Sequence, residues 1–162
     1  TGRGLIQPDP MIRKKLIQET GPKGDDWLDL VRCATFEVTS EEASSPLENA
    51  LTPDSKKWTA STQGEQTIRI AFDEARDISK IYLLFEETEV SRSQEFVLSW
   101  LPTGQSTWQE IVRQQFNFSP PNTTQEKENF TVWLERAAAL ELRIIPERSG
   151  GGRASLSQLL IS

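Results

Sequence analysis

The sequence QTIRIAF at positions 66–72 alternates apolar and polar side chains with a period of two residues. Ile68, Ile70 and Phe72 fall on one face of an extended chain, and the residues between them fall on the other. The same period returns in four more segments, and an apolar run at 156–161 closes the series. These segments predict β-strands with one buried and one solvated face. The four segments are 78–85, 95–101, 130–134 and 140–144.

Clusters of Pro, Gly, Asn, Ser and Thr separate the predicted strands, and no segment between them has helical periodicity. This order favours an antiparallel β-sandwich over a parallel sheet, because parallel strands need long, usually helical, crossovers. The connections are long and polar, at 39–66, 86–94, 102–107, 113–129 and 147–155. Ten side chains are expected inside the sandwich: Ile68, Ile70, Phe72, Ile81, Leu83, Phe96, Leu98, Trp100, Leu142 and Ile144.

A chain of 162 residues suits one such domain, predicted at 29–162, preceded by an N-terminal extension at 1–28. Within the extension, residues 11–19 carry apolar side chains at helical spacing, which predicts a short helix or arm. Residues 1–10 precede the only methionine, Met11, and are interpreted as a cloning remnant or as part of a longer protein.

Charge and hydropathy exclude two classes of partner. The net charge is −6 and the pI is about 4.8, which is the wrong sign for neutralising a phosphate backbone, so no nucleic acid is expected. No apolar run reaches the roughly 20 residues that span a bilayer, so no membrane association is expected. The given N-terminus does not resemble a signal peptide, and a soluble, cytoplasmic protein is the favoured interpretation. The oligomeric state is not indicated.

The residues for most enzyme chemistry are absent. The chain has no histidine and a single cysteine, Cys33, so it cannot form a Ser-His-Asp or Cys-His relay or a multi-cysteine metal site. The glycines at 150–152 lack the Lys-Ser/Thr of a phosphate-binding loop. Glu86, Glu87 and Glu89 lie close in sequence, but a solvated acidic loop accounts for them without catalysis. The sequence therefore predicts no catalytic residue and no cofactor.

Five motifs follow one another in order along the chain. They are an Asn-Ala turn with a downstream tryptophan, two core strands, a strand and turn ending in a tryptophan, and closing strands, at 46–61, 66–72, 78–85, 95–108 and 140–156. Together they resemble the galactose-binding-like superfamily, also called the discoidin or coagulation factor V/VIII type C superfamily, over residues 29–162. The resemblance implies a jelly-roll β-sandwich.

The resemblance also implies binding without catalysis. Carbohydrate binding is the leading function because it is the commonest role in the superfamily. Segments 48–58 and 64–68 resemble the N-terminal domain of the X-ray repair cross-complementing scaffold protein, which is an interaction module. A protein-interaction module of an intracellular complex is therefore the alternative, and a glycan-cleaving enzyme is the third hypothesis.

The chain departs from the superfamily at its calcium site. Many relatives place an acidic residue shortly after the Asn-Ala turn and another near the C-terminus, where this chain has Thr52 and Ser157-Gln158. Calcium needs six to eight oxygen ligands, and Asp54 supplies one carboxylate at most. No obligatory metal is predicted.

In the superfamily, ligands meet the loops at one end of the sandwich, which correspond here to 39–45 and 86–94. The candidate ligand-binding residues in these loops are Glu41, Glu42, Glu87, Glu89 and Arg92. The carboxylates would accept hydrogen bonds from sugar hydroxyls or from basic side chains, and Arg92 would donate them.

Trp133 is a second candidate for ligand binding. It alternates out of phase with Phe130, Val132 and Leu134, so it projects from the opposite face of its strand. Two interpretations remain open. The indole is either an exposed aromatic platform or a surface covered by the predicted N-terminal helix.

Overall fold

The computed structural model describes residues 27–54 and 56–162. The predicted N-terminal helix at 11–19 lies outside the described residues. Strands dominate the described chain, with one helical turn and one 3₁₀ turn. In chain order the elements are α1 (Leu30–Cys33), β1 (Ala34–Val38), η2 (Leu47–Ala50), β2 (Trp58–Thr59), β3 (Gln66–Glu86), β4 (Arg92–Pro102), β5 (Gln109–Phe118), β6 (Gln125–Ile145), β7 (Ser155–Leu156) and β8 (Gln158–Ile161).

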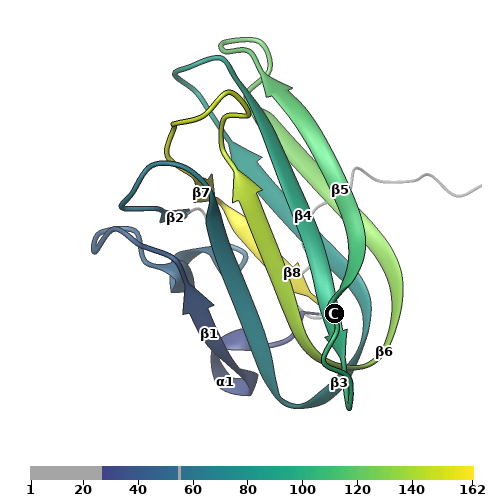
Figure 1. Ribbon diagram of the computed structural model, residues 1–162. Coiled ribbons are helices and arrows are strands. Elements are labelled where there is room, and N and C mark those ends of the chain that lie inside the picture. The colour runs from purple at the N-terminus through teal and green to yellow at the C-terminus, as the bar shows by residue number, and fades with distance from the viewer. Residues whose placement is uncertain (1–26, 55) are drawn as a thin grey trace, which may run out of the picture.

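Two long strands, β3 and β6, run the length of the molecule and belong to both layers of the sandwich (Figure 1). The first half of β3 and the second half of β6 lie in a layer with the order β1-β3-β6-β4-β5. The second half of β3 pairs with β8 and with the first half of β6. All of these pairings are antiparallel, so the predicted antiparallel sandwich is confirmed.

The strands pass between the layers where their register is irregular. The β3 and β6 pairing shifts between Ala71 and Arg76 and again before Lys80, and Arg136 of β6 has a φ of 52°. Such irregularities bend a strand and increase its twist. The predicted strands at 66–72 and 78–85 are consequently one bent strand.

The predicted long connection at 113–129 is wrong. Strand β5 continues to Phe118 and β6 begins at Gln125, which leaves only 119–124 as a connection. Gln114 and Phe116 are partly buried and alternate with exposed residues along β5, opposite β4. The polar glutamines and glutamates on both strands hid this alternation in the sequence.

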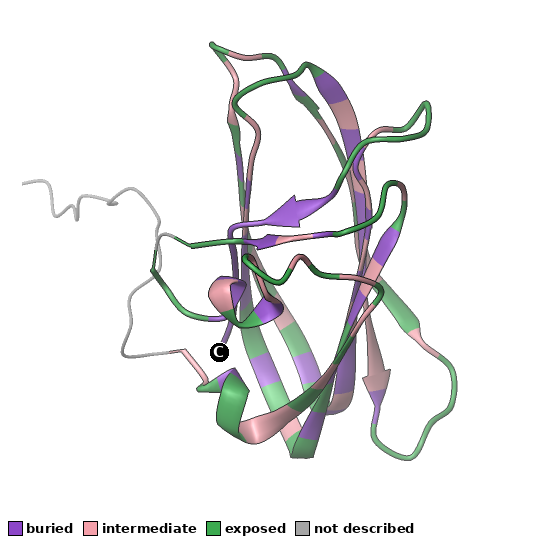
Figure 2. Ribbon diagram, turned by 90° about the vertical axis from the view of Figure 1, so that its left-hand side faces the viewer, coloured by how far each residue is buried: buried purple, intermediate pink, exposed green. Residues whose placement is uncertain are grey.

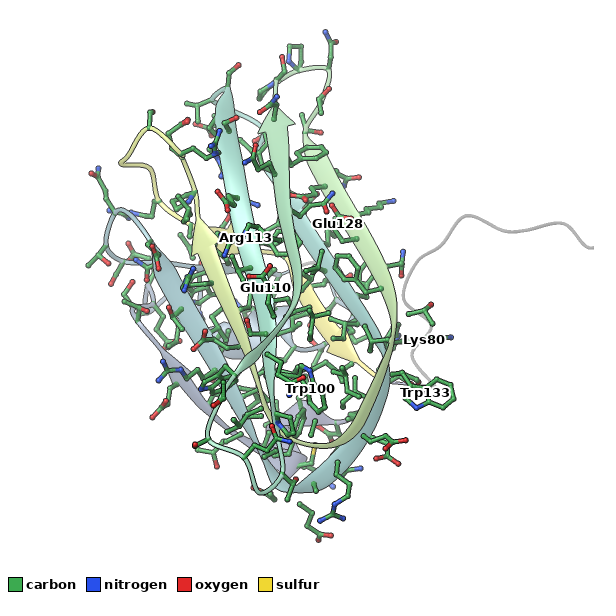
Figure 3. The ribbon with its side chains drawn as sticks, turned by 45° about the vertical axis from the view of Figure 1, so that its right-hand side comes forward. Lys80, Trp100, Glu110, Arg113, Glu128 and Trp133 are labelled. Atoms are coloured by element: carbon green, nitrogen blue, oxygen red, sulfur yellow. The ribbon has the colours of Figure 1, made fainter. Side chains whose placement is uncertain are left out.

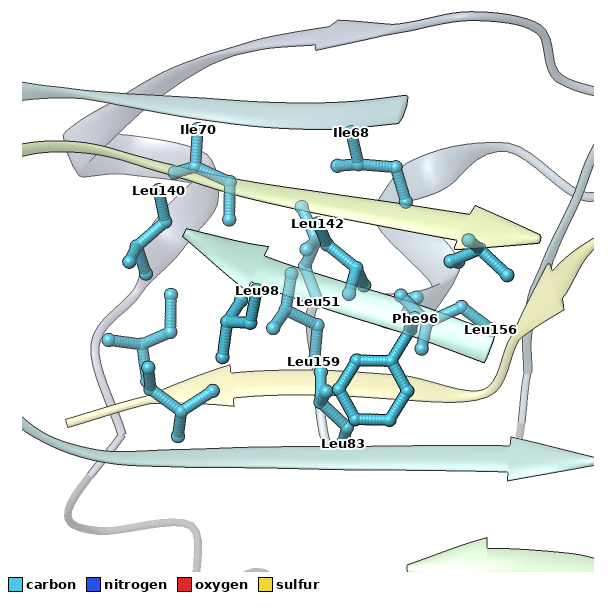
Figure 4. Packing of buried hydrophobic residues seen from close by; sticks show 14 of the residues in the cluster. Leu51, Ile68, Ile70, Leu83, Phe96, Leu98, Leu140, Leu142, Leu156 and Leu159 are labelled. Carbon is cyan, nitrogen blue, oxygen red and sulfur yellow. The ribbon is translucent and has the colours of Figure 1, made fainter. Parts of the chain in front are cut away.

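Buried and exposed residues alternate along the strands, and the apolar faces meet between the layers (Figures 2 and 4). Nine of the ten side chains expected in the core are buried, and Trp100 is partly buried against the same cluster. Phe96 lies at the centre of an aromatic group, with ring centroids 5.3 Å from Phe85 and 6.3 Å from Phe130. The core prediction is therefore largely confirmed.

The first described residues are attached to the layer that the second half of β3 forms with β8 and the first half of β6. The amide of Leu28 donates to the Ile161 carbonyl at 2.8 Å, and the Trp27 ring lies 6.5 Å from that of Tyr82. Among the described residues, no helix has both the length and the apolarity required to cross a bilayer.

Phe96→Ala should lower the free energy of unfolding by about 3 to 5 kcal/mol, because it removes a fully buried ring and leaves a cavity. Urea denaturation measures the change. Trp133→Ala is the matched control, since an exposed aromatic side chain should contribute no more than about 0.5 kcal/mol. Equal effects of the two substitutions would contradict the assignment of Phe96 to the core.

A polar cleft at one end of the sandwich

The connections at 87–91, 119–124 and 146–154 gather at one end of the sandwich (Figure 1). A cleft of about 760 Å³ opens beside the first and third of them. Its lining comes from three regions of sequence: 44–59, 86–89 and 153–155. The end of β3 and the start of β7 therefore position residues that are far apart in the sequence around one space.

Backbone hydrogen bonds connect the segments that surround the cleft. Thr59 of β2 lies opposite Ser155 of β7, and the Thr59 amide donates to the Ser45 carbonyl at 3.1 Å. On the other side of β7, the Ser157 amide donates to the Leu84 carbonyl of β3 at 2.8 Å. These bonds set the order of the segments across the cleft, from the end of β3 through β7 and β2 to the turn at Ser45.

The acidic wall is the tight turn after β3. The Glu87 carboxylate accepts hydrogen bonds from the amides of Glu89 at 3.0 Å and Val90 at 3.2 Å through one oxygen, and from Arg92 Nε at 2.7 Å through the other. Partial burial raises the pKa of Glu87, but these three donors outweigh it, so the net pKa is lowered. Glu87 therefore serves as the internal anchor of the turn.

Arg92 is buried, with 5% of its side chain exposed. Besides Glu87, its guanidinium donates to Gln94 Oε1 and to the Pro146 carbonyl, both at 2.8 Å. The guanidinium carbon also lies 4.7 Å from the centre of the Phe118 ring. One cation thereby joins the connection at 87–91 to the end of β5 and to the connection that follows β6.

A neutral carboxyl group lies behind Arg92. Gln94 Nε2 donates to Glu126 Oε1 at 3.3 Å, and Glu126 is 1% exposed. Burial, followed by the neighbouring Glu128 carboxylate, raises the pKa of Glu126 to about 9. The second oxygen, Oε2, has no partner among the described residues. Glu126 is therefore protonated at neutral pH.

The opposite wall carries Lys56 and Lys57 between the 3₁₀ turn η2 and β2. Asn49 Nδ2 donates to the Lys57 carbonyl at 3.0 Å, and the buried indole of Trp58 donates to the Ser40 carbonyl at 3.0 Å. These two bonds hold the backbone of the segment. Both lysines are exposed, so their ammonium groups reach the solvent at the rim of the cleft.

The third side of the cleft carries Arg153. Its Nη1 donates to Glu42 Oε1 at 2.7 Å, which links the connection after β6 to the segment before η2. The preceding glycines at 150–152 have φ values of 108°, 79° and 77°, a backbone region that other residues adopt rarely. Arg153 follows this run directly and lines the cleft with a half-exposed side chain.

The structure brings some of the predicted site residues together and separates others. Glu87 and Glu89 line the cleft, and Glu42 reaches it through Arg153. Glu41 accepts a hydrogen bond from the Leu47 amide at 2.9 Å, at the start of η2. Arg92 belongs to β4 rather than to a loop, and its donors are directed inward.

Lys56, Lys57 and Arg153 were not predicted from the sequence as binding residues. The Lys57-Trp58 pair and the strand beginning near Ser155 belong to motifs that carry the fold resemblance. Membership in these two motifs was the one sequence feature that could have identified the residues, because both motifs border the same end of the sandwich. The position of Arg153 at the cleft depends on its ion pair with Glu42, which lies more than one hundred residues earlier in the sequence.

Trp133 is 86% exposed and projects outward from the sandwich (Figure 3), and it is not among the residues that line the cleft. Along β6 it is eight residues from Gln125, which pairs with Glu86 beside the cleft, and this corresponds to a separation of about 26 Å. Its indole nitrogen donates to Glu135 Oε2 at 3.3 Å. The predicted aromatic platform would therefore be a separate surface from the cleft.

The described residues near Asp54 form a closed hydrogen-bonded turn. Asp54 Oδ2 accepts from the Thr52 hydroxyl at 3.0 Å, Asp54 Oδ1 accepts from the Lys56 amide at 3.1 Å, and Gln158 Nε2 donates to the Asp54 carbonyl at 3.0 Å. Within 27–54 and 56–162, no group of three or more metal-ligating side chains is present. The donor set does not fit a calcium ion, which requires many free oxygen ligands.

Solved structures with the same architecture include carbohydrate-binding modules. A pectin-binding module matches with a TM-score of 0.57 and 19% identity, covering 81% of this chain and 91% of that one. Module CBM32-3 of a Clostridium perfringens family 31 glycoside hydrolase matches with a TM-score of 0.59 and 18% identity, covering 88% and 98%. The family 32 module of C. perfringens NanJ, solved with galactose, matches with a TM-score of 0.54 and 20% identity, covering 79% and 92%.

No family model and no curated protein sequence matches the chain. The matched modules have the galactose-binding-like, discoidin-type fold, and this chain has the same fold, as the sequence resemblance implied. At 18–20% identity this similarity defines the architecture alone.

Glu126→Gln should stabilise the protein increasingly as the pH rises. Between the ordinary pKa of 4.5 and the raised pKa of about 9, folded Glu126 holds a proton that the unfolded chain has released. Its contribution to stability is therefore full below the lower value and is lost with rising pH, by up to about 1.4 kcal/mol per pH unit. Glutamine removes this dependence.

Urea denaturation across this pH interval measures the effect of Glu126→Gln. Exposed Glu135→Gln is the matched control and should follow the wild type. Parallel pH profiles for wild type and Glu126→Gln would show that Glu126 is ionised in the folded protein.

The melting temperature should be the same in calcium chloride and in EDTA. A ligand that binds only the folded state raises the melting temperature with its concentration, and the closed turn at Asp54 offers calcium too few oxygens. A rise with calcium that EDTA reverses would contradict this prediction, and Asp54→Asn would then test whether this turn holds the ion.

Proposed function

We propose that this protein is a non-catalytic carbohydrate-binding domain and that the cleft at 44–59, 86–89 and 153–155 is its binding site. The observation that carries the proposal is the lining of the cleft. Apart from Pro46 and the alkyl stems of the lysines, its side chains are hydroxyl, amide, carboxylate and cationic groups. A volume of about 760 Å³ has room for a short oligosaccharide.

The polar groups of the cleft are suited to a sugar. Each sugar hydroxyl both donates and accepts hydrogen bonds, and the lining offers acceptors in Glu89 and Asn49 and donors in Lys56, Lys57 and Arg153. No aromatic ring lines the cleft among the described residues. Recognition would therefore depend on hydrogen bonds, with little contribution from stacking.

The similarity to solved structures supports the same proposal. The pectin-binding module and the NanJ module in complex with galactose share the architecture of this chain along most of their length. Binding sites on a β-sandwich are usually built from the loops at its ends, because loops vary while the strands hold them in place. The cleft occupies such an end.

The charges of the cleft favour binding over glycoside hydrolysis. A glycosidase needs one carboxyl group with a raised pKa as the general acid and a second carboxylate across the sugar. The pKa of Glu87 is lowered, and Glu126, whose pKa is raised, is buried behind Arg92. Neither group can protonate a glycosidic oxygen in the cleft.

Glu89→Ala should weaken glycan binding at least about tenfold, because hydrogen bonds to a charged group contribute about 1.5 to 3 kcal/mol. A glycan array identifies a ligand, and isothermal titration calorimetry measures the affinity. Glu74→Ala is the matched control, since Glu74 is exposed in the bend of β3 and does not line the cleft.

The control variant should bind like the wild type. Absence of binding to every glycan by folded wild-type protein would contradict carbohydrate binding and would favour the protein-interaction alternative. Equal affinities of the wild type and Glu89→Ala would show that a bound glycan lies outside the cleft.

A further inference from the structure

We propose that the ligand of the cleft is an anionic sugar, a uronic acid residue of a glycan, whose carboxylate is bound by Lys56, Lys57 and Arg153. The inference rests on the carbohydrate-binding function proposed above. Some polar groups of the cleft already have hydrogen-bond partners within the chain, and others remain available to a ligand. The inference follows from this difference.

Most carboxylate oxygens of the acidic wall are already occupied. Glu86 accepts from the Ser157 hydroxyl at 2.8 Å through one oxygen and from Gln125 Nε2 at 2.9 Å through the other. Both oxygens of Glu87 also have donors within the chain. The Glu89 carboxylate is the one carboxylate of the cleft without a side-chain partner among the described residues. Glu89 is therefore the carboxylate of this wall that is most available to a ligand.

The donors on the opposite wall are free. The ammonium groups of Lys56 and Lys57 have no ion pair or hydrogen bond among the described residues, although the Lys57 backbone is held by Asn49. Arg153 uses Nη1 for Glu42, and its side chain remains 49% exposed. Three cations therefore border the cleft with unused N–H groups.

The difference between available cationic donors and available carboxylates indicates the chemistry of the ligand. Three cationic side chains with unused N–H groups face a single carboxylate, Glu89, that has no side-chain partner, and such a site is best matched by an anionic group that accepts several hydrogen bonds at once. The protein carries a net charge of −6, so an anion is attracted only where cations gather, within the roughly 8 Å range of unscreened charge. Glu89 remains available to a hydroxyl group of the same sugar.

The hypothesis is tested with a short oligogalacturonate and its fully methyl-esterified form, which has the same sugar backbone but carries an uncharged methyl ester in place of each carboxylate. By titration calorimetry the acid should bind at least about tenfold more tightly than the ester. Added salt should lower the affinity for the acid and leave the affinity for the ester unchanged. Lys57→Met should reduce the affinity for the acid about tenfold and leave the affinity for the ester unchanged.

Lys80→Met is the matched control, because Lys80 is an exposed lysine of β3 that lies near Trp133 (Figure 3) and does not line the cleft. It should leave both affinities unchanged, and a thermal melt of each variant verifies folding. An ester or a neutral galactan that binds as tightly as the acid would overturn the anionic ligand and leave carbohydrate binding intact. Failure of all glycans to bind would overturn the proposed function as well.

Discussion

The buried guanidinium of Arg92 fixes the arrangement on which the cleft depends. A cation inside a sandwich is strongly destabilising unless several groups compensate it, and four groups from separate parts of the chain do so here. They are the Glu87 carboxylate, the Gln94 amide, the Pro146 carbonyl and the face of the Phe118 ring. Because each must meet the same cation, the ends of β3, β5 and β6 cannot move independently, and the acidic wall keeps its position.

Because Arg92 is buried, some polar groups near the cleft bond to it or to each other, and others remain available to a ligand. Glu87 is used to hold its own turn and Arg92, and Glu126 avoids a second buried charge by keeping its proton. The oxygens of Glu87 are used within the chain in this way, whereas the side chains of Lys57 and Arg153 line the cleft without a hydrogen bond to Arg92 among the described residues. The electrostatic character of the cleft is thus a consequence of how the sandwich closes at this end.

The apolar part of this structure could be predicted from the sequence, whereas much of the polar part could not. Ile68 and Phe96 identify their strands because an apolar face that repeats every second residue is typical of a half-buried strand. Arg92 and Glu126 also occupy inward positions of their strands, but charged residues there resemble loop residues until their partners are known. Lys57 could not be identified as a binding residue, since its relation to the other walls arises from pairing between β2 and β7.

Ligand binding in the loop-end cleft is tested most directly by mapping amide chemical shifts with NMR during a titration with oligogalacturonate. We expect the perturbed amides to gather at Lys57, Thr59, Glu89 and Arg153, with little change at Trp133 on the distant part of β6. Perturbations centred on Trp133, with the cleft amides unchanged, would contradict the assignment of the cleft as the ligand site.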